Sequence, residues 1–438
     1  MATAARRSRN GGLKWKVLAL IFAICLCIQG VDASSNQETA GLVEKVKATL
    51  KWTATKGLEK VTSAWEWLGF GDQCRFVDHP SVSVRKHLQT HLKAQDRALE
   101  TIIGAIESWE FSRSNSKDQA PLVLAITGPT GTGKTETSNL LAEGLFKRRK
   151  RLEHSEKEIA SGLIVFRGED FSDNFTNPVT EYQEQIKTRL AEHLSWCSGK
   201  AIVVFDEVQK VIPHTLDVLT SAMSKNAQIT YYKNGVARKV DCSNVIFVLI
   251  SDIGVAAIEK LLMQYDKREE IPPATLENEV KKALDSQWKR LQFGKMIHQV
   301  VPFLPFEQRH VVEIIELKLA QLSSNYQGKY WRRLDFDAAI APHLSRLESV
   351  LYLERRAVLH AGTEVRKIFA KYGARDVESG PIQQLKSKLM RHLRPFNTQA
   401  NLTVTLSGDE VEIVSCFEES KGDAVLVSCV TKWKGRFK

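Results

Sequence analysis

A glycine-rich segment carries the strongest chemical signal in the sequence. It matches the pattern G-x-x-x-x-G-K-T, and it lies between a run that predicts a strand and a segment that predicts a helix. Backbone N–H groups of such a loop curl around phosphate oxygens, and the following helix directs its positive end toward them. The residues predicted to bind nucleotide are Gly128, Pro129, Thr130, Gly131, Thr132, Gly133, Lys134, Thr135 and Glu136.

Two side chains of this loop have specific expected roles. The Lys134 ammonium would reach the β- and γ-phosphates of ATP, and the Thr135 hydroxyl would bind Mg²⁺. A second signal supports them, because the apolar run 201–205 ends in Asp206 and Glu207. Asp206 would hold Mg²⁺, and Glu207 would act as general base toward the attacking water. Together the two signals predict ATP hydrolysis with Mg²⁺ as cofactor.

Short apolar runs predict the strands that must position these residues. They are rich in β-branched and aromatic residues, and segments of helical periodicity separate most of them. Such alternation predicts an α/β fold whose parallel sheet is covered on both faces. An Asn-Gly turn at 234–235 predicts one hairpin. The predicted strands are Leu122–Thr127, Leu163–Arg167, Ala201–Phe205, Val245–Ser251 and Val300–Phe303.

Beyond Pro305 the sequence becomes helical, and it ends in short β-type runs. Val312, Ile315, Leu319 and Leu322 form one apolar stripe. Further helices are expected at 335–350, 352–372 and 381–393, and strands at 402–406, 411–416 and 424–431. The expected organisation is a signal peptide (1–33), an amphipathic segment (34–75), a large nucleotide-binding domain (76–304), a small helical lid (305–395) and a β tail (396–438).

The first residues of the chain are typical of a secretory signal. A basic stretch precedes the apolar run 17–28, and Val31-Asp32-Ala33 supplies small residues before Ser34. The run has about 12 residues, whereas a membrane-spanning helix needs roughly 20. A cleaved signal is therefore favoured, with a signal anchor as the alternative. A mitochondrial transit peptide is disfavoured because such peptides are amphipathic.

Residues 34–75 have the pattern of one or two amphipathic helices. Trp52, Trp65 and Trp67 would either lie at a membrane surface or pack on the protein's own domain, and the sequence leaves both open.

Five cysteines follow the signal, and their odd number leaves at least one thiol unpaired within the chain. They are Cys74, Cys197, Cys242, Cys416 and Cys429. The last two flank a predicted turn, so they either form a disulfide across two strands or remain free thiols.

Composition excludes several classes of protein. A chain of 438 residues that is 43% hydrophobic and 26% charged fits two or three globular domains, not a collagen-like or largely disordered chain. Residues 1–33 hold five of the 62 basic residues and one of the 51 acidic residues, so the formal charge falls from +11 to +7 without them. No basic stretch is interleaved with aromatic residues, so no nucleic-acid partner is expected.

Together the motifs resemble the AAA+ ATPases of the Clp/HSP100 branch over roughly residues 76–395, and within that branch they are most similar to the torsins. The phosphate loop, the Asp206-Glu207 strand and Asn244–Gly254 carry the first resemblance, together with Gln95–Ala98. The stretch Val301–His310 is similar to the torsin pattern PFLP-E-x-x-H, and no aromatic pore loop occurs between Phe171 and Leu190. The resemblance implies a three-layer AAA+ domain followed by a helical lid.

The sequence also departs from the family pattern. Asp252 occupies the sensor-1 position, where relatives carry Asn, and its charge would repel a γ-phosphate. Lys295 lies where Clp ATPases place an arginine finger. Torsins also lack that arginine and obtain it from a membrane-anchored cofactor. At the sensor-2 turn, Clp relatives have Gly-Ala-Arg and torsins Gly-Cys-Lys. We align this turn with Gly362–Glu364, which leaves Arg366 or Lys367 as the expected nucleotide contact.

The resemblance implies slow, partner-activated ATP hydrolysis that remodels proteins or membranes in the endoplasmic reticulum lumen or nuclear envelope. It also implies a homo- or hetero-oligomeric ring, a membrane-anchored activator and a protein client. Two other interpretations stay open. The chain could be a nucleotide-switched binding module with little hydrolysis, or a self-sufficient Clp-type unfoldase.

Overall fold

The structure is a computed structural model of the whole chain, and the helices and strands described below lie within residues 72–438. It describes residues 73–114, 119–151, 157–173, 178–287, 295–358, 364–392, 400–421 and 424–437. The predicted signal peptide (1–33) and nearly all of the predicted amphipathic segment (34–75) lie outside these residues. Within the described residues, no helix is both long and apolar enough to span a bilayer.

Five parallel strands form the larger sheet, in the order β4-β5-β8-β1-β9. They are β1 (Leu122–Thr127), β4 (Leu163–Arg167), β5 (Lys200–Asp206), β8 (Asn244–Ser251) and β9 (Gln299–Pro302). All five strands predicted from the sequence are confirmed. So is the hairpin, which is formed by β6 (Gln228–Lys233) and β7 (Val236–Asp241) around the Asn-Gly turn.

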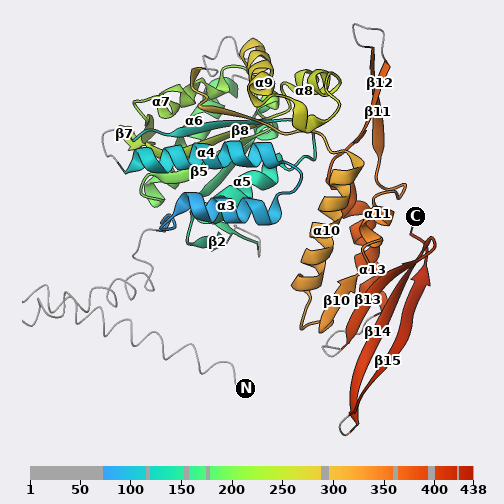
Figure 1. Cartoon of the computed structure of the whole chain (residues 1–438). Helices are drawn as coiled ribbons and strands as arrows, with labels where there is room; N and C mark the ends of the chain where they lie inside the picture. The colour runs from blue at the N-terminus through green and yellow to red at the C-terminus, as the bar shows by residue number, and fades with distance from the viewer. Residues whose placement is uncertain are drawn as a thin grey trace, which may run out of the picture. The chain divides into compact units, whose positions relative to one another are not determined.

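Helices cover both faces of this sheet (Figure 1). Strand β1 shows why, since all six of its residues are buried and successive side chains point to opposite faces. Leu124 packs into a core with the first helix group, whereas Val123 packs into a second core with the other group. The first group is α3 (Pro80–His91), α4 (Asp96–Arg113) and α5 (Lys134–Leu145); the second is α6 (Pro178–Trp196), α7 (Thr220–Met223), α8 (Val255–Leu262) and α9 (Pro273–Gln287).

Short elements complete this part of the chain. They are β2 (Arg149–Arg151), β3 (Glu158–Ala160), and the 3-10 turns η1 (Gly168–Phe171), η2 (Val208–Lys210), η3 (Thr215–Leu219) and η4 (Arg268–Glu270).

A third core combines the predicted lid with the predicted β tail. Ile315 and Trp331 from the lid segment are buried together with Leu402 and Val411 from the tail. The helices are α10 (Gln308–Asn325), α11 (Ile340–Leu344), α12 (Arg375–Val377), the π-helical turn η6 (Glu378–Ile382) and α13 (Gln383–His392). The sheet has the order β10-β13-β14-β15, formed by β10 (Arg333–Phe336), β13 (Asn401–Ser407), β14 (Glu410–Lys421) and β15 (Ala424–Gly435). The tail strands are confirmed, but they share the core of the lid.

The prediction of a helix at 352–372 is wrong. This stretch forms an antiparallel hairpin of β11 (Tyr352–Val358) and β12 (Glu364–Ala370). Its charged residues favour helices in isolation, but they form contacts outside the hairpin: Arg355 pairs with Glu259 at 2.9 Å, and Lys367 Nζ donates to the Asp266 carbonyl at 2.9 Å. The helix expected at 335–350 is likewise reduced to the five-residue α11, preceded by β10.

Two disulfides link segments that the sequence separates. Cys416 and Cys429 face each other in the β14–β15 register and are bonded, which decides the alternative that the sequence left open. Cys74 is bonded to Cys197, a pairing that the sequence did not indicate. Cys242 is buried as a free thiol, and burial raises its pKa to about 12.

Candidate nucleotide site

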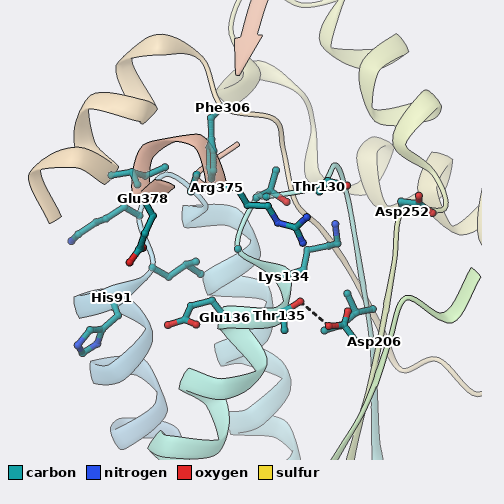
Figure 2. A pocket seen from close by; sticks show the side chains of 18 of the residues that line it. His91, Thr130, Lys134, Thr135, Glu136, Asp206, Asp252, Phe306, Arg375 and Glu378 are labelled. Atoms are coloured by element: carbon teal, nitrogen blue, oxygen red, sulfur yellow. Dashed lines mark hydrogen bonds between the residues drawn. The ribbon is translucent and has the colours of Figure 1, made fainter. Parts of the chain in front are cut away.

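A cleft of about 990 Å³ opens at the carboxyl ends of β5 and β8. Its walls come from segments that are far apart in the sequence: the glycine-rich loop, the residues after β5 and β8, and the third core (Figure 2). The sequence-predicted residues that line it are Thr130, Gly131, Thr132, Gly133, Lys134, Thr135, Glu136, Asp206, Glu207 and Asp252. Gly128 and Pro129 contribute carbonyl groups that contact Lys134.

The glycine-rich loop has the backbone that its sequence requires. Gly133 has φ 99° and directly precedes α5, whose first residue is Lys134. Gly131 has φ 76°, in the left-handed region that favours glycine. The free N–H groups at the start of α5 therefore point toward the cleft, where they suit an anion.

Lys134 lies deep in this loop. Its ammonium donates to the carbonyl oxygens of Gly128 at 2.6 Å and Pro129 at 2.8 Å. Burial lowers the pKa of Lys134 to about 8, even though the Asp252 and Asp206 carboxylates oppose that shift. The ammonium is thus desolvated and placed where it can meet a phosphate.

Thr135 and Asp206 form a pair that fits a magnesium ion. The Thr135 hydroxyl donates to Asp206 Oδ2 at 2.9 Å, the hydrogen bond drawn in Figure 2. Mg²⁺ binds oxygens at about 2.1 Å, so neighbouring ligands of an octahedron lie about 3 Å apart. No cluster of three or more potential metal-ligating His, Cys, Asp or Glu residues occurs among the described residues. One carboxylate and one hydroxyl suit an ion that completes its shell with phosphate and water.

Glu207 follows Asp206 with a left-handed backbone, φ 58° and ψ 49°. Its carboxylate lines the cleft and forms an ion pair with Lys210 at 2.6 Å. Asp252 follows β8 directly and lies on the same side of the cleft, near Lys134. The structure therefore gathers Asp206 and Glu207, the two acidic residues of the second signal, and the expected sensor-1 residue Asp252 around the Lys134 ammonium group.

The expected nucleotide contact at Arg366 disagrees with the structure. Arg366 lies on β12, where its guanidinium pairs with Glu364 at 3.1 Å, and it does not line the cleft. Arg375 lines the cleft instead, and its guanidinium points toward Lys134 (Figure 2). Arg375 closes the triplet Gly373-Ala374-Arg375, which has the Gly-Ala-Arg pattern that the resemblance to Clp ATPases implies for the sensor-2 turn. The Gly-Ala-Arg pattern is therefore present in the sequence itself. It lies 11 positions after Gly362, where the sequence analysis places the sensor-2 turn.

This turn contacts the glycine-rich loop through backbone atoms. The Ala374 N–H donates to the Gly131 carbonyl at 2.8 Å. A Cβ on Gly131 would lie 1.9 Å from the Tyr372 carbonyl oxygen, and a Cβ on Gly373 would lie 2.4 Å from the Gly131 oxygen. Glycine is therefore needed on both sides, and the two walls of the cleft meet at this contact.

The stretch similar to the torsin pattern joins the sheet to the third core. Leu304 exchanges two hydrogen bonds with the buried Gln95 amide, at 2.8 and 3.1 Å. The Phe306 carbonyl accepts from the Ala370 N–H at 2.8 Å. The Glu307 N–H donates to His310 Nδ1 at 3.0 Å, and burial lowers the pKa of His310 to about 3, so this ring is neutral. The segment positions the lid against the phosphate loop.

Lys295 is exposed and does not line the cleft. Among the described residues that line the cleft, Arg375 is the one arginine. The described part of the chain therefore offers one guanidinium group to this site.

Comparisons with known proteins agree with the resemblance and the fold. Residues 69–205 match the sequence family described as Torsin. The chain is 24% identical over 350 residues to a mitochondrial disaggregase of Rattus norvegicus, an alignment that covers 73% of this chain and 46% of the relative. It is also 24% identical over 307 residues to a torsin-like protein of Caenorhabditis elegans, which covers 68% of this chain and 77% of the relative. The chain thus spans about half the length of the disaggregases.

Solved structures match at the level of the fold. The Hsp104–ADP complex of S. cerevisiae superposes with a TM-score of 0.53 at 18% identity, covering 75% of this chain and 50% of the Hsp104 chain. The chain resembles torsins and Clp/HSP100 ATPases, and its α/β fold is that of AAA+ proteins.

Proposed function

We propose that this protein is a torsin-like AAA+ ATPase that uses slow, partner-activated hydrolysis of Mg-ATP to remodel proteins or membranes. The observation that carries the proposal is the convergence of Lys134, the Thr135–Asp206 pair, Glu207 and Arg375 on one cleft. Each residue type matches one requirement of phosphoryl transfer, which depends on positioning and charge stabilisation.

The chain's own groups divide this work. The N–H groups at the start of α5 and the Lys134 ammonium hold the phosphates. Thr135 and Asp206 would hold Mg²⁺, which neutralises phosphate charge when bound. Glu207 accepts the proton of the attacking water, and Arg375 lies where a guanidinium can stabilise phosphate charge.

Partner activation is proposed because one arginine serves the site within the described residues. An arginine donated by another subunit contributes about 10³–10⁵ in rate in related phosphoryl-transfer enzymes. A membrane-anchored activator, or a neighbouring subunit of a ring, would supply it. The protein client stays unspecified, and no nucleic-acid partner is proposed.

The proposed compartment is the lumen of the endoplasmic reticulum or nuclear envelope. The signal-like N-terminus and two disulfides support an oxidising compartment. Mitochondria are the alternative, because relatives named mitochondrial disaggregase match as well. Thiol titration of the denatured, unreduced protein purified from its native source tests this choice. A chain that lacks residues 1–33 and has both disulfides shows one reactive thiol, Cys242, whereas the same chain with all its cysteines reduced shows five.

Two features of the site favour the two other interpretations, the nucleotide-switched binding module and the self-sufficient unfoldase. Asp252 beside Lys134 adds negative charge near the phosphates, as expected of a switch that binds ATP and hydrolyses little. The Gly373-Ala374-Arg375 turn has the Clp form, as expected of a self-sufficient unfoldase.

Steady-state ATPase activity and ATP affinity of the purified protein test these three functions, with Glu207→Gln as the blank. Tight ATP binding with very slow turnover that rises on addition of a partner supports the proposal. Rapid turnover by the protein alone, abolished by Glu207→Gln, favours the unfoldase. Binding without any turnover above the blank, with or without partners, leaves the switch.

A further inference from the structure

Glu207 and Lys210 are coupled by local backbone geometry. Glu207 precedes the 3-10 turn η2, and the Lys210 N–H donates to the Glu207 carbonyl at 2.9 Å. This backbone hydrogen bond brings residue 210 back beside residue 207. The Lys210 ammonium contacts Glu207 Oε2 at 2.6 Å.

The same ammonium contacts a second carboxylate. Lys210 Nζ lies 2.7 Å from Glu169 Oε1, and Glu169 belongs to η1, directly after β4. Strand β4 neighbours β5, which leads into Glu207. Hydrogen bonds to Glu169 and Glu207 raise the pKa of Lys210, so the ammonium is charged at neutral pH. One cation thus joins the ends of two adjacent strands at the edge of the cleft.

Backbone packing fixes this arrangement. A Cβ on Gly168 would lie 2.1 Å from the Glu207 carbonyl oxygen, so the end of β4 lies directly against the Glu207 backbone. Glu169 is therefore held next to Lys210 by the chain itself. The arrangement does not depend on long flexible loops.

The Glu207 side chain needs an external restraint. It is 39% exposed, and within the described part of the chain Lys210 is the cation that pairs with its carboxylate. An exposed carboxylate samples several rotamers, whereas a general base must lie within hydrogen-bonding distance of the water it activates. Exposed ion pairs contribute little to folding. The effect of this pair is therefore expected in the reaction and not in stability.

We propose that Lys210 is a positioning residue for the general base Glu207, and that Glu169 anchors Lys210 from the neighbouring strand. This inference rests on the proposed ATPase function. It assigns to Lys210 no contact with the nucleotide. Its ammonium sets the direction of the Glu207 carboxylate, and the oxygen that does not face Lys210 is left to accept a proton.

Single-turnover hydrolysis of γ-labelled ATP by the full chain, with protein in excess, tests the inference at rates too slow for steady-state assays. Lys210→Met is expected to lower the hydrolysis rate about tenfold while the ATP dissociation constant stays within twofold. Lys210→Arg should restore most of the rate, and Glu169→Gln should lower it about threefold. In the Lys210→Met background Glu169→Gln should have no further effect, because its anchoring partner is gone.

Lys282→Met is the matched control. Lys282 forms an ion pair with Glu279, three positions earlier on α9, at 2.5 Å and away from the cleft. The Lys282→Met variant should hydrolyse ATP at the wild-type rate. A Lys210→Met rate within twofold of this control would overturn the inference, as would a rate loss caused only by weaker ATP binding. If wild type and Glu207→Gln hydrolyse equally slowly, the ATPase proposal itself fails, and the inference fails with it.

Discussion

The two walls of the cleft differ in how they present their functional residues. On the sheet wall, Lys134, Asp206 and Asp252 each lie within two residues of a strand end or helix start, fixed by a parallel sheet. On the lid wall, Arg375 lies on a three-residue helix that follows the β11–β12 hairpin. Each residue of the first wall is positioned by the strand or helix that it ends or begins. The second depends on contacts made across the cleft, so the chemistry of one wall is sensitive to the folding of the other.

Removal of the lid-wall arginine is expected to have the largest effect. Arg375→Ala should lower the ATP hydrolysis rate on the order of 10²-fold, because a guanidinium that stabilises developing phosphate charge is lost. Single-turnover rates measure this. Arg366→Ala is the matched control from β12 and should hydrolyse ATP at the wild-type rate. Equal losses in both variants would contradict the assignment of Arg375 to the cleft.

Disruption of the backbone contact between the two walls is expected to have the second-largest effect. Gly373→Ala would place a Cβ 2.4 Å from the Gly131 oxygen and force the turn off the phosphate loop. ATP affinity should fall about tenfold, as measured by fluorescence titration with a labelled nucleotide. Gly328→Ala is the control, since Gly328 also has a positive φ, of 75°, but no atom within 4 Å of its added Cβ. It should lose some stability yet bind ATP normally.

The sheet wall predicts a pH dependence of ATP binding. The pKa of Lys134 is lowered to about 8 by burial, and the charged form binds phosphate. Below pH 8 the ammonium is present and affinity should be constant. Above pH 8 the neutral amine must take up a proton before it can bind phosphate. The ATP affinity should therefore fall, and the decrease should approach tenfold for each pH unit. The Lys134→Arg variant stays charged and should not show this decrease of ATP affinity above pH 8. A flat profile for the wild type would contradict the burial argument.

The smallest effect is expected in the middle of the β11–β12 hairpin. Arg355→Ala removes the exposed pair with Glu259, and surface pairs contribute little. The melting temperature should fall by less than about 2 °C, with ATP hydrolysis unchanged. Arg356→Ala, which loses only a pair with Glu354 inside the hairpin, is the comparison. A clear loss of hydrolysis in Arg355→Ala alone would mean that the hairpin helps to position the lid wall.

The sheet region could be predicted from the sequence because its signals are local. Each β strand is a continuous apolar run, since both faces of a parallel sheet are buried. The glycine-rich loop fixes its own backbone, and Asp206 with Glu207 directly follows a strand. These residues meet because carboxyl ends of parallel strands lie at one edge of a sheet. The sequence therefore indicated the cleft, its phosphate-binding loop and the candidate base.

The lid region could not be predicted in the same way. Residues 352–370 hold many charged side chains, which suit a helix as well as a strand, and tertiary contacts to Glu259 and Asp266 accompany the hairpin. The helix predicted for this stretch places the sensor-2 turn at Gly362, whereas the triplet Gly373-Ala374-Arg375 follows the hairpin that the stretch forms. The sequence likewise did not indicate the Cys74–Cys197 disulfide, because its two cysteines lie 123 positions apart.

The sequence by itself therefore determined the parallel sheet, the phosphate loop and the order of acidic residues, because hydrophobic periodicity and glycine geometry are properties of short segments. Only the tertiary structure decided which arginine faces the phosphate loop, that the β tail shares the core of the lid, and that Lys210 and Glu169 meet at Glu207. Those outcomes depend on contacts between segments far apart in the chain, where packing outweighs local preference.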